Sequence, residues 1–408
     1  MTLALPRQPP WPFVRACLFG LAAMVATALP SHIAPTPFNN YVLLANAFLH
    51  HHAWIEWPGR YIDAVEWNGR RYVVNDPVPA ILLLPYVAYA GLEANQTLLS
   101  VILAGFAAAA AWGIAENLDV PLRRAAVVCA FLFAGTDLWW GSVLGDVWFL
   151  AQTSAVAFML LSLLELSAPK PRGWVVAFFY ALALGSRFTV VTALPVIAYF
   201  VYLGNLDAYR PVYENRLRRL LGFGLVMAIF AALWMFYNDI RWGVVWDSGH
   251  TIFFHQDVSA GSPFGSPFGL QHIGYQLNSF LILRPQIFVY DHRLWIVPRK
   301  FGTALTWTSP ALIFALWARE PYLSVRALWI ATFLAAAPSL LYYVNGYSQF
   351  GMRHALDFEP FLFVLMLFAA RRNLPAWISL LVLYSIAATA YGIWFWLHFY
   401  PRPVLPPA

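Results

Sequence analysis

Charged residues are scarce in this sequence: Asp, Glu, Lys and Arg together make up only 11% of its 408 residues. Soluble domains contain about 25% charged residues, so the shortage argues against a water-soluble fold. Cysteine is also rare. Cys17 and Cys129 both lie inside apolar runs, which argues against a disulfide-stabilised scaffold. The basic residues are scattered one or two to a loop, which argues against a nucleic-acid partner.

Long apolar runs dominate the sequence instead, with 61% hydrophobic residues and a mean hydropathy of +0.62. We expect an all-α polytopic membrane protein, a single membrane domain over residues 1–408 with about eleven transmembrane helices. The predicted spans are approximately 12–30, 96–116, 123–139, 147–167, 173–186, 188–203, 217–237, 303–318, 324–343, 357–371 and 374–396. A further run, 78–91, is too short to span, and we expect it to re-enter or to lie at the interface.

Basic residues occur in every second loop between these spans. They are Arg7, Arg15, Arg123, Arg124, Lys170, Arg172, Arg210, Arg216, Arg218, Arg219, Arg319, Arg326, Arg371 and Arg372. Because basic loops stay in the cytoplasm, we expect a cytoplasmic N-terminus and an outer C-terminal tail, 400–408. Only Lys170 and Lys300 are lysines among the 25 basic residues. This bias is typical of GC-rich bacterial genomes, so we expect a bacterial cytoplasmic (inner) membrane.

Two large loops, 31–77 and 238–301, fall on the outer side, so we expect the function there. In the first, Thr36 is a candidate cap for an amphipathic interfacial helix over 38–50. Asn68-Gly69 then predicts a short β-hairpin. The second loop contains a Gly-Ser-Pro-Phe repeat, 261–269, which is typical of a flexible, lid-like segment.

Acidic residues of the first loop are the candidate catalytic groups. The hairpin register places Glu66 opposite Arg71, which predicts a cross-strand ion pair. Asp63 and Asp76 fall together on one face without an obvious local partner. They suit a general base and its helper, or two oxygen ligands for a divalent Mg or Mn ion. The alternative is that both are solvated loop acids.

Three other sets of outer residues each leave two interpretations open. The run His50-His51-His52 invites a metal site, but adjacent helical residues point in different directions and favour interfacial polar residues. Asp137, Asp146 and Arg187 at span ends are either functional or merely snorkelling. Arg353 either meets an anionic partner or pairs with Asp357 one turn on.

The chain resembles the GT-C superfamily of integral-membrane glycosyltransferases. The resemblance covers most of the chain and lies in the layout: one span, an outer loop with an interfacial helix and acidic residues, and a short apolar segment with paired prolines. The stretches that carry it are Asn40-Tyr41 through Ala47-Phe48-Leu49, Trp67-Asn68-Gly69-Arg70-Arg71-Tyr72, Pro77-Val78-Pro79 to Pro85, Ser186-Arg187 to Pro195, Tyr237-Asn238 through Arg241-Trp242-Gly243, and Phe350-Gly351-Met352-Arg353-His354.

The resemblance implies sugar transfer, with inversion, from a polyprenyl-phosphate-sugar donor to a glycan, lipid or protein acceptor outside the cytoplasm. The acidic pair of this family usually lies soon after the first span, where this chain has Asn39-Asn40. An amide cannot take a proton, so we expect Asp63, helped by Asp76, to act as the base. The implied donor-phosphate ligands are Arg353, Arg241 and Arg187, and the implied acceptor or sugar contacts are Asn39, Asn40, Tyr41 and Trp67.

Other functions fit the same layout. One is an envelope polysaccharide polymerase or ligase that uses a pyrophosphate-linked donor. Another is a lipid or solute transporter, which is less favoured because polar residues gather at the outer edge and the halves show no repeat. A third is a family member that has lost activity, for which Asn39-Asn40 is the motive.

Overall fold

Helices make up most of the computed structural model, which describes residues 11–60, 62–256 and 266–400. The α-helices are α1 (Trp11–Ser31), α2 (Asn40–Leu49), α3 (Val78–Ala90), α4 (Gln96–Asn117), α5 (Leu122–Ala134), α6 (Asp137–Leu144), α7 (Val147–Ser167), α8 (Gly173–Leu184), α9 (Leu194–Leu203), α10 (Arg216–Trp242), α11 (His250–Gln256), α12 (Ile273–Leu281), α13 (Leu305–Thr308), α14 (Tyr322–Leu341), α15 (Glu359–Arg372) and α16 (Ala376–Phe399). The 3₁₀ helices are η1 (Gly91–Glu93), η2 (Phe188–Ala193), η4 (Leu270–His272), η5 (Pro310–Trp317) and η6 (Arg353–Asp357). Two antiparallel hairpins join β1 (Val65–Trp67) to β2 (Arg70–Tyr72) and β3 (Gln286–Tyr290) to β4 (Arg293–Val297).

Six helices of the described residues are long and apolar enough to cross a membrane: α1, α4, α7, α10, α14 and α16. Each has at least 20 residues, about the length that a hydrocarbon core of roughly 30 Å requires. Helices α5 and α6 give a seventh candidate if they form one bent span. The expected helical fold with several membrane-length helices is therefore confirmed in outline, whereas the expected total of eleven spans exceeds these helices.

Several predicted spans are short or interrupted helices. The run 123–139 divides into α5 and α6, which are bent by 47° where the Thr136 side chain caps α6. The run 188–203 divides into η2 and α9. The run 303–318 divides into α13 and η5 at Pro310, which cannot donate the hydrogen bond that a continuous helix needs. Local capping and proline chemistry thus replaces three straight spans by broken ones.

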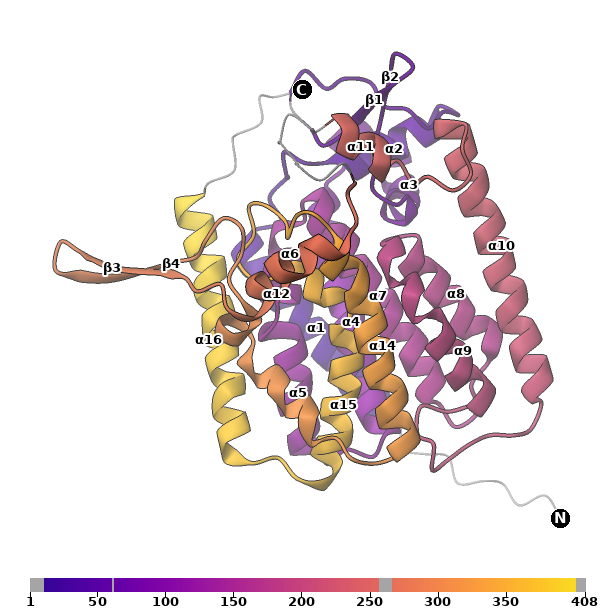
Figure 1. Cartoon of the computed structure of the whole chain (residues 1–408), viewed down its shortest axis with the longest axis vertical. Helices are drawn as coiled ribbons and strands as arrows, with labels where there is room; N and C mark the ends of the chain where they lie inside the picture. The colour runs from indigo at the N-terminus through magenta and orange to yellow at the C-terminus, as the bar shows by residue number, and fades with distance from the viewer. Residues whose placement is uncertain (1–10, 61, 257–265, 401–408) are drawn as a thin grey trace.

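Helices α4 and α7 form the centre of the bundle. In their membrane-length stretches, 67% and 83% of the residues are buried. Helix α1 packs closely on α4, because a Cβ atom on Gly20 would lie 2.7 Å from the carbonyl oxygen of Gly105. Small residues allow membrane helices such close contact. Figure 1 shows α10 at the periphery of the bundle. Only 6% of the residues in its membrane-length stretch are buried.

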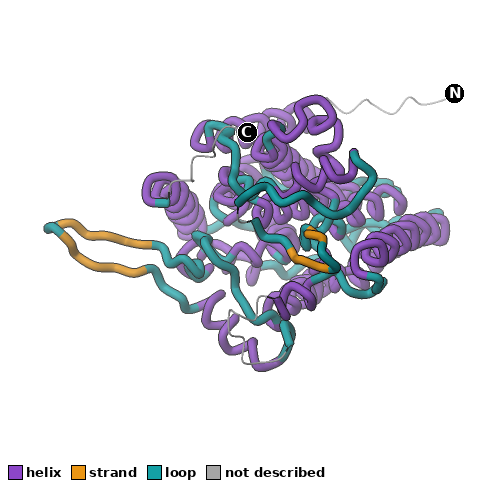
Figure 2. Tube along the Cα trace, turned by 90° about the horizontal axis from the view of Figure 1, so that it is seen from above, coloured by secondary structure: helices purple, strands orange, loops and turns teal. Residues whose placement is uncertain are grey.

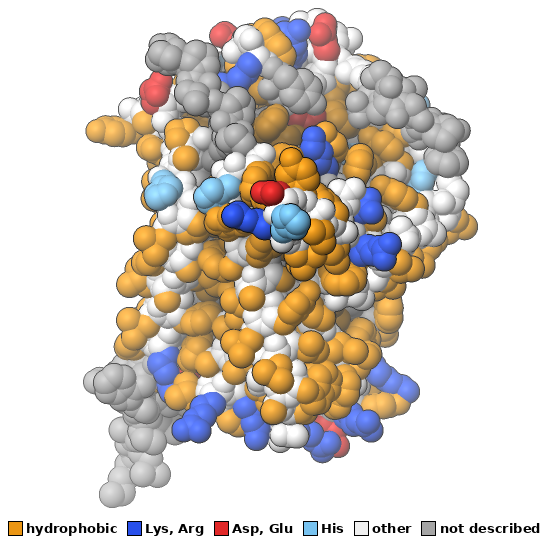
Figure 3. Space-filling model, turned by 90° about the vertical axis from the view of Figure 1, so that its left-hand side faces the viewer, with side chains coloured by type: hydrophobic (Ala, Val, Ile, Leu, Met, Phe, Trp, Pro, Cys, Tyr) orange, Lys and Arg blue, Asp and Glu red, His pale blue; other side chains and the backbone are white. Residues whose placement is uncertain are grey.

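The surface of the bundle is apolar in its middle and charged at its ends. Figure 3 shows a belt of hydrophobic side chains, with Lys and Arg gathered at the lower end. Three ion pairs join the loops of this end: Arg210 with Asp119, Arg371 with Asp207, and Arg372 with Glu320. The basic loops that we expect to be cytoplasmic therefore share one end of the molecule.

The first outer loop contains the expected hairpin at the opposite end. Strands β1 and β2 pair around Asn68 and Gly69 in the predicted register. Both turn residues have positive φ, 50° and 72°, which suits a tight hairpin turn. Glu66 and Arg71 lie opposite each other with 3.5 Å between the charged atoms, so the predicted cross-strand ion pair is confirmed.

Helix α2 differs from its prediction in its start and its surroundings. It begins at Asn40, with Asn39 at the cap position, so Thr36 lies too early in the chain to cap it. The Thr36 hydroxyl instead accepts from the Phe38 amide and donates to the Asp146 carboxylate. Six of its ten residues are buried. The helix is therefore enclosed by protein on most sides rather than lying with one whole face in lipid.

The run 78–91 forms α3, whose 13 residues are too few to cross a membrane. Its start is tied to the end of α8, since the Val78 amide donates to the Gly185 carbonyl oxygen at 2.8 Å. The second outer loop carries α11, η4, α12 and the β3–β4 hairpin, which projects away from the bundle in Figures 1 and 2. Most of the Gly-Ser-Pro-Phe repeat, Arg7 and the tail 401–408 lie outside the described residues.

Candidate functional site at the outer end of the bundle

Six charged side chains lie near one another at the end of the bundle opposite the basic loops. We call them the outer cluster: Asp63, Asp76, Arg187, Arg241, Arg353 and Asp357. They come from the first outer loop, the turn between α8 and η2, the end of α10, and η6. Electrostatic interactions join Asp63 to Arg353, Asp76 to Arg187 and Arg241, and Arg187 to Arg353. The fold thus brings together all five residues that the sequence suggests as base, helper and phosphate ligands.

Arg187 forms a buried ion pair with Asp357 from a distant part of the chain. The Arg187 Nε donates to one Asp357 carboxylate oxygen, and the Thr189 hydroxyl donates to the other at 2.9 Å. The Asp357 side chain is only 1% exposed. Burial disfavours the Arg187 cation, but Asp357, with Asp76 and Tyr342, outweighs burial, so the pKa of Arg187 is raised. The pair fixes η6 against the turn that follows α8.

Asp76 is buried and fastens the first outer loop to the same turn. Its Oδ2 atom accepts a hydrogen bond of 2.9 Å from the backbone amide of Phe188. Burial raises the pKa of the Asp76 carboxyl, while the Phe188 amide, Arg241 and Arg187 partly offset that effect. Asp76 therefore has a structural partner that is close in space but distant in the sequence, which its sequence position did not reveal.

Arg241 is buried at the end of α10, and its donors serve the protein itself. Its Nη1 donates to the Val73 carbonyl oxygen at 3.1 Å, and its Nη2 donates to Asn238 Oδ1 at 2.8 Å. The guanidinium carbon lies 3.9 Å from the centroid of the Tyr237 ring. Arg241 thus adds positive charge to the outer cluster mainly while holding the first outer loop onto α10.

Arg353 differs from the other two arginines because part of its guanidinium has no protein partner. Its Nε and Nη1 atoms are inaccessible to solvent and have no hydrogen-bond partner among the described residues. The predicted alternative, pairing with Asp357, is wrong, because Asp357 binds Arg187 and Thr189. Burial, followed by Arg187, lowers the pKa of Arg353 to about 10, although Asp63 acts in the opposite direction.

The rings of Trp148 and Phe149 lie beside Arg353, with centroids 6.0 Å and 5.4 Å from its guanidinium carbon. Contact with aromatic rings helps to orient an arginine. A buried donor without a partner costs free energy until it meets an acceptor. Arg353 therefore has hydrogen-bond donors that the described residues leave unused.

Asp63 is half-buried on the rim of the outer cluster. Its Oδ2 atom accepts a hydrogen bond of 2.6 Å from the indole Nε1 of Trp148. Its backbone carbonyl accepts another of 2.8 Å from the Asn40 amide nitrogen. Trp148 thus contacts both Asp63 and Arg353, so one side chain of α7 orients the candidate base and the candidate anion site.

The residues suggested for acceptor binding are placed less openly than expected. Asn40 and Tyr41 are both fully buried. Asn39 accepts a hydrogen bond of 2.7 Å from Arg60, and Trp67 packs at the edge of a small cluster beside Tyr72 and Trp242. Asn40 is hydrogen-bonded to the backbone of Asp63. This contact supports the position of Asp63 and does not expose Asn40 to a substrate.

Two buried carboxylates beside Arg353 belong to the same region. Asp137 interacts with Arg353 and Glu359, and it accepts a hydrogen bond from the Gly351 backbone amide. A Cβ atom at position 351 would lie 2.7 Å from Asp137 Oδ2, so this contact requires glycine. Sequence analysis singled out Asp137 but not Glu359. The available signal was a carboxylate inside the predicted span 357–371.

An apolar cavity of about 350 Å³ lies between η2, α9 and α10. The side chains that line it are Leu184, Phe188, Val191, Leu194, Met227, Phe230, Ala231, Trp234, Met235 and Trp246. Phe188 and Trp234 stack within it, with ring centroids 4.2 Å apart and planes 9° from parallel. Since Phe188 directly follows Arg187 and donates its amide to Asp76, the cavity adjoins the outer cluster.

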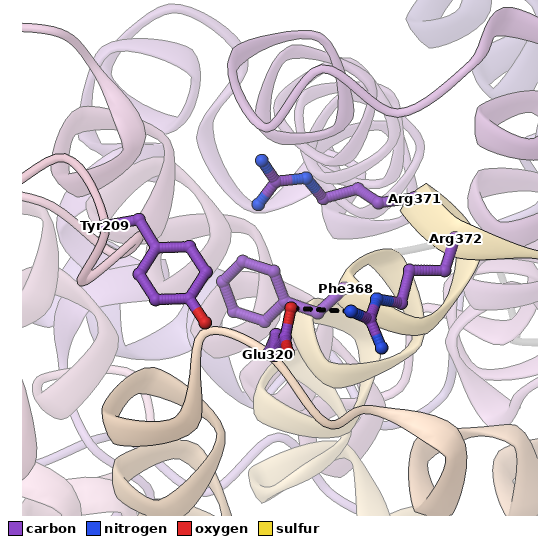
Figure 4. A pocket seen from close by; sticks show the side chains of 5 residues that line it. All are labelled: Tyr209, Glu320, Phe368, Arg371 and Arg372. Carbon is purple, nitrogen blue, oxygen red and sulfur yellow. Dashed lines mark hydrogen bonds and ion pairs between the residues drawn. The ribbon is translucent and has the colours of Figure 1, made fainter.

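A second cavity, of about 200 Å³, lies at the basic end of the molecule. Figure 4 shows its lining side chains, Tyr209, Glu320, Phe368, Arg371 and Arg372. Arg372 pairs with Glu320 at 2.7 Å, and Arg371 pairs with Asp207 at 2.8 Å. Its cations thus already form ion pairs within the protein.

The histidine run and the acidic pair do not form a metal centre in the described part of the chain, where no three His, Cys, Asp or Glu side chains converge. His52 stacks on Trp54 with ring centroids 4.0 Å apart. Asp63 and Asp76 are each bound by a different element, α7 and η2. The side chains present therefore do not fit the Mg or Mn ion suggested for the acidic pair.

Comparisons of the chain with protein-family models, with curated proteins and with solved structures find no match.

Proposed function

We propose that this protein is a membrane glycosyltransferase, which moves a sugar from a polyprenyl-phosphate donor to an acceptor on the outer face of a bacterial cytoplasmic membrane. One observation carries the proposal: an apolar cavity adjoins a charged cluster in which Arg353 has unpartnered N–H groups. A polyprenyl phosphate has the same two parts, a long apolar chain and an anionic head. The resemblance of the chain to the GT-C superfamily supports the same function.

The proposed topology has eleven crossings, with the N-terminus in the cytoplasm and α3 re-entrant. The bent pair α5–α6 and the short helices α8, η2–α9, α13–η5 and α15 supply the crossings beyond the six long helices. The grouping of the basic loops at one end supports this sidedness. The outer cluster then lies at the outer interface, where a lipid-linked phosphate would sit.

In the proposed donor complex, the polyprenyl chain lies in the apolar cavity beside α10, and the phosphate meets Arg353. Arg187 and Arg241 add positive charge while keeping their protein partners. Charge that develops on the leaving phosphate is stabilised by cations already in place, because they need no reorganisation during the reaction.

Asp63 acts as the general base in this mechanism. The acceptor hydroxyl gives its proton to the Asp63 carboxylate while its oxygen forms a bond to the anomeric carbon of the sugar. The bond from that carbon to the phosphate oxygen breaks on the opposite side, so the configuration inverts and the polyprenyl phosphate leaves as an anion. Trp148 keeps the carboxylate oriented through its indole N–H. Asp76 helps by fixing the loop and the turn that carries Arg187.

The acceptor approaches from above the first outer loop. Asn39 and Trp67 are half-buried there, whereas Asn40 and Tyr41 are covered by protein. We therefore assign acceptor contacts to Asn39 and Trp67, and a supporting role to Asn40 and Tyr41.

The test is transfer of labelled sugar from a panel of polyprenyl-phosphate sugars by the purified protein in detergent. We expect Asp63→Asn to lower the rate at least about 100-fold, the usual scale for loss of a general base. Glu66→Gln is the matched control, because Glu66 lies in the same loop but only pairs with exposed Arg71. Equal transfer by Asp63→Asn and wild type would refute the base. Transfer only from pyrophosphate-linked donors would instead favour the polymerase or ligase.

The lipid part of the proposal has its own test. Ala231→Trp fills the apolar cavity without touching a charged residue. We expect it to raise the KM for a long-chain donor at least about tenfold, while the KM for a donor with a very short prenyl chain stays unchanged. An equal change for both donors would show that the cavity does not hold the chain.

A further inference from the structure

The β3–β4 ribbon is an apolar element whose strands are exposed along almost their whole length. It projects sideways from the bundle and touches no other element near its turn, as Figures 1 and 2 show. Its strands pair in full register across five residues each. Six large apolar side chains on it are 41% to 70% exposed: Ile287, Phe288, Val289, Tyr290, Leu294 and Ile296. Exposed apolar surface of this kind marks an interaction site.

The two faces of the ribbon differ in chemistry. Side chains alternate along a strand, and directly paired residues share a face. The pairs Ile287 with Ile296 and Val289 with Leu294 make one face wholly aliphatic. The pairs Phe288 with Trp295 and Tyr290 with Arg293 make the other face aromatic and basic. This pattern, with aliphatic residues on one face and Trp, Tyr and Arg on the other, is typical of an element at a membrane interface.

The base of the ribbon lies beside the outer end of α16. The Tyr391 hydroxyl donates to the Ile296 carbonyl oxygen at 2.6 Å, and the Trp295 ring lies 5.9 Å from the Phe399 ring. Tyr391 and Phe399 lie in the last turns of this membrane-length helix, about 12 Å apart along its axis at roughly 1.5 Å per residue. The ribbon therefore leaves the bundle at the depth where α16 would leave the hydrocarbon.

The charges of the ribbon suit an anionic surface. The segment 284–300 contains four basic residues, Arg284, Arg293, Arg299 and Lys300, and Asp291 is its single acid. Anionic lipid headgroups attract basic residues that lie close to the bilayer.

We infer that the β3–β4 ribbon lies flat in the outer interface of the membrane, with its aliphatic face toward the acyl chains and its aromatic and basic face among anionic headgroups. Its two outer edges carry unpaired backbone groups, which hydrocarbon does not tolerate. The ribbon therefore stays at headgroup depth. It anchors the second outer loop to lipid, which steadies the surface beside the outer cluster.

Fluorescence quenching tests the inference in the full-length protein, reconstituted in vesicles of phosphatidylethanolamine and phosphatidylglycerol. A Cys17→Ala background removes the exposed native thiol, and Cys129 is buried. Val289→Cys and Tyr290→Cys then carry an environment-sensitive fluorophore. They form a matched pair, since both native side chains are 70% exposed and face opposite ways. A lipid with a nitroxide on its acyl chain is the quencher.

We expect quenching at position 289 to exceed that at position 290 by about twofold, because only the aliphatic face meets the acyl chains. Two controls fix the scale. Leu383→Cys on α16, where leucine is 63% exposed, reports the lipid-facing limit, and Arg70→Cys on the β1–β2 hairpin reports the aqueous limit.

The inference fails if position 289 is quenched no more than position 70 while position 383 is quenched strongly. A Val289→Cys disulfide between two copies, together with unquenched label, would assign the ribbon to a protein partner and overturn the lipid assignment. An unquenched label at position 383 would refute the membrane placement of α16, and the inference with it.

Discussion

The buried ion pair between Arg187 and Asp357 offers the sharpest test of how the outer cluster is built. Asp357→Asn keeps the side-chain shape and an acceptor for Thr189, but it removes the charge that faces Arg187. Loss of one member of a buried pair costs about 3–5 kcal/mol. Because the Arg187 side chain is 20% exposed, water offsets part of this cost. We expect the free energy of unfolding to fall by about 2–4 kcal/mol.

Removing both charges separates stability from function. A double variant, Arg187→Met with Asp357→Leu, replaces the pair by apolar side chains of similar size. Such replacements are often neutral, so we expect stability within about 1 kcal/mol of the wild type. Under the proposed function, sugar transfer should not recover, because Arg187 would no longer add positive charge to the proposed phosphate site.

The assay is unfolding in mixed micelles by added dodecyl sulfate, followed by tryptophan fluorescence. Glu66→Gln is the control, since the exposed pair of Glu66 with Arg71 should contribute less than about 1 kcal/mol. If Asp357→Asn unfolded within about 0.5 kcal/mol of the wild type, the pair would not hold η6 against α8 and the reasoning would be refuted.

Three further predictions concern single residues. If the proposed donor site is right, Arg353→Met should abolish transfer. It should leave the free energy of unfolding unchanged or higher, because it removes a cation whose Nε and Nη1 atoms are buried without a partner among the described residues. A loss of stability would contradict the proposed anion site. Burial raises the pKa of Asp76 in the folded state, so at this site the fold binds more protons than the unfolded chain does. The free energy of unfolding should therefore decrease as the pH rises above the ordinary pKa of an aspartate. Asp76→Asn should flatten that dependence in pH-resolved unfolding. Burial, with Arg187 and Arg241, lowers the pKa of His250 from 6.5 to about 4. Between these two pH values the unfolded chain binds more protons at this site than the fold does. The free energy of unfolding should therefore decrease as the pH drops from 6.5 to about 4, by at most about 1.4 kcal/mol per pH unit. His250→Gln should remove the drop, and an unchanged profile would show that His250 is not its source.

Sequence alone determined the features that depend on neighbours along the chain. Low charge and long apolar runs predicted the membrane-length helices. Asn68-Gly69 fixed the register of the first hairpin, because a two-residue turn leaves one pairing available. The alternation of basic loops predicted which loops share an end of the bundle.

The choice of charged partners required the tertiary structure. Spacing along the chain offered Asp357 as one possible partner of Arg353, but the fold gives Asp357 to Arg187 and leaves Arg353 with unpartnered donors. Asp76 likewise binds the Phe188 amide, far away in sequence. Ion pairing depends on distance in space, which helical periodicity fixes only within one helix.

The enclosure of α2 and the apolar cavity beside α10 were also decided by packing. Hydropathy reports how apolar a segment is, but not whether lipid or protein covers it, because both environments favour the same side chains. Helix α2 is covered by protein and α10 is not, and only the assembled bundle distinguishes them.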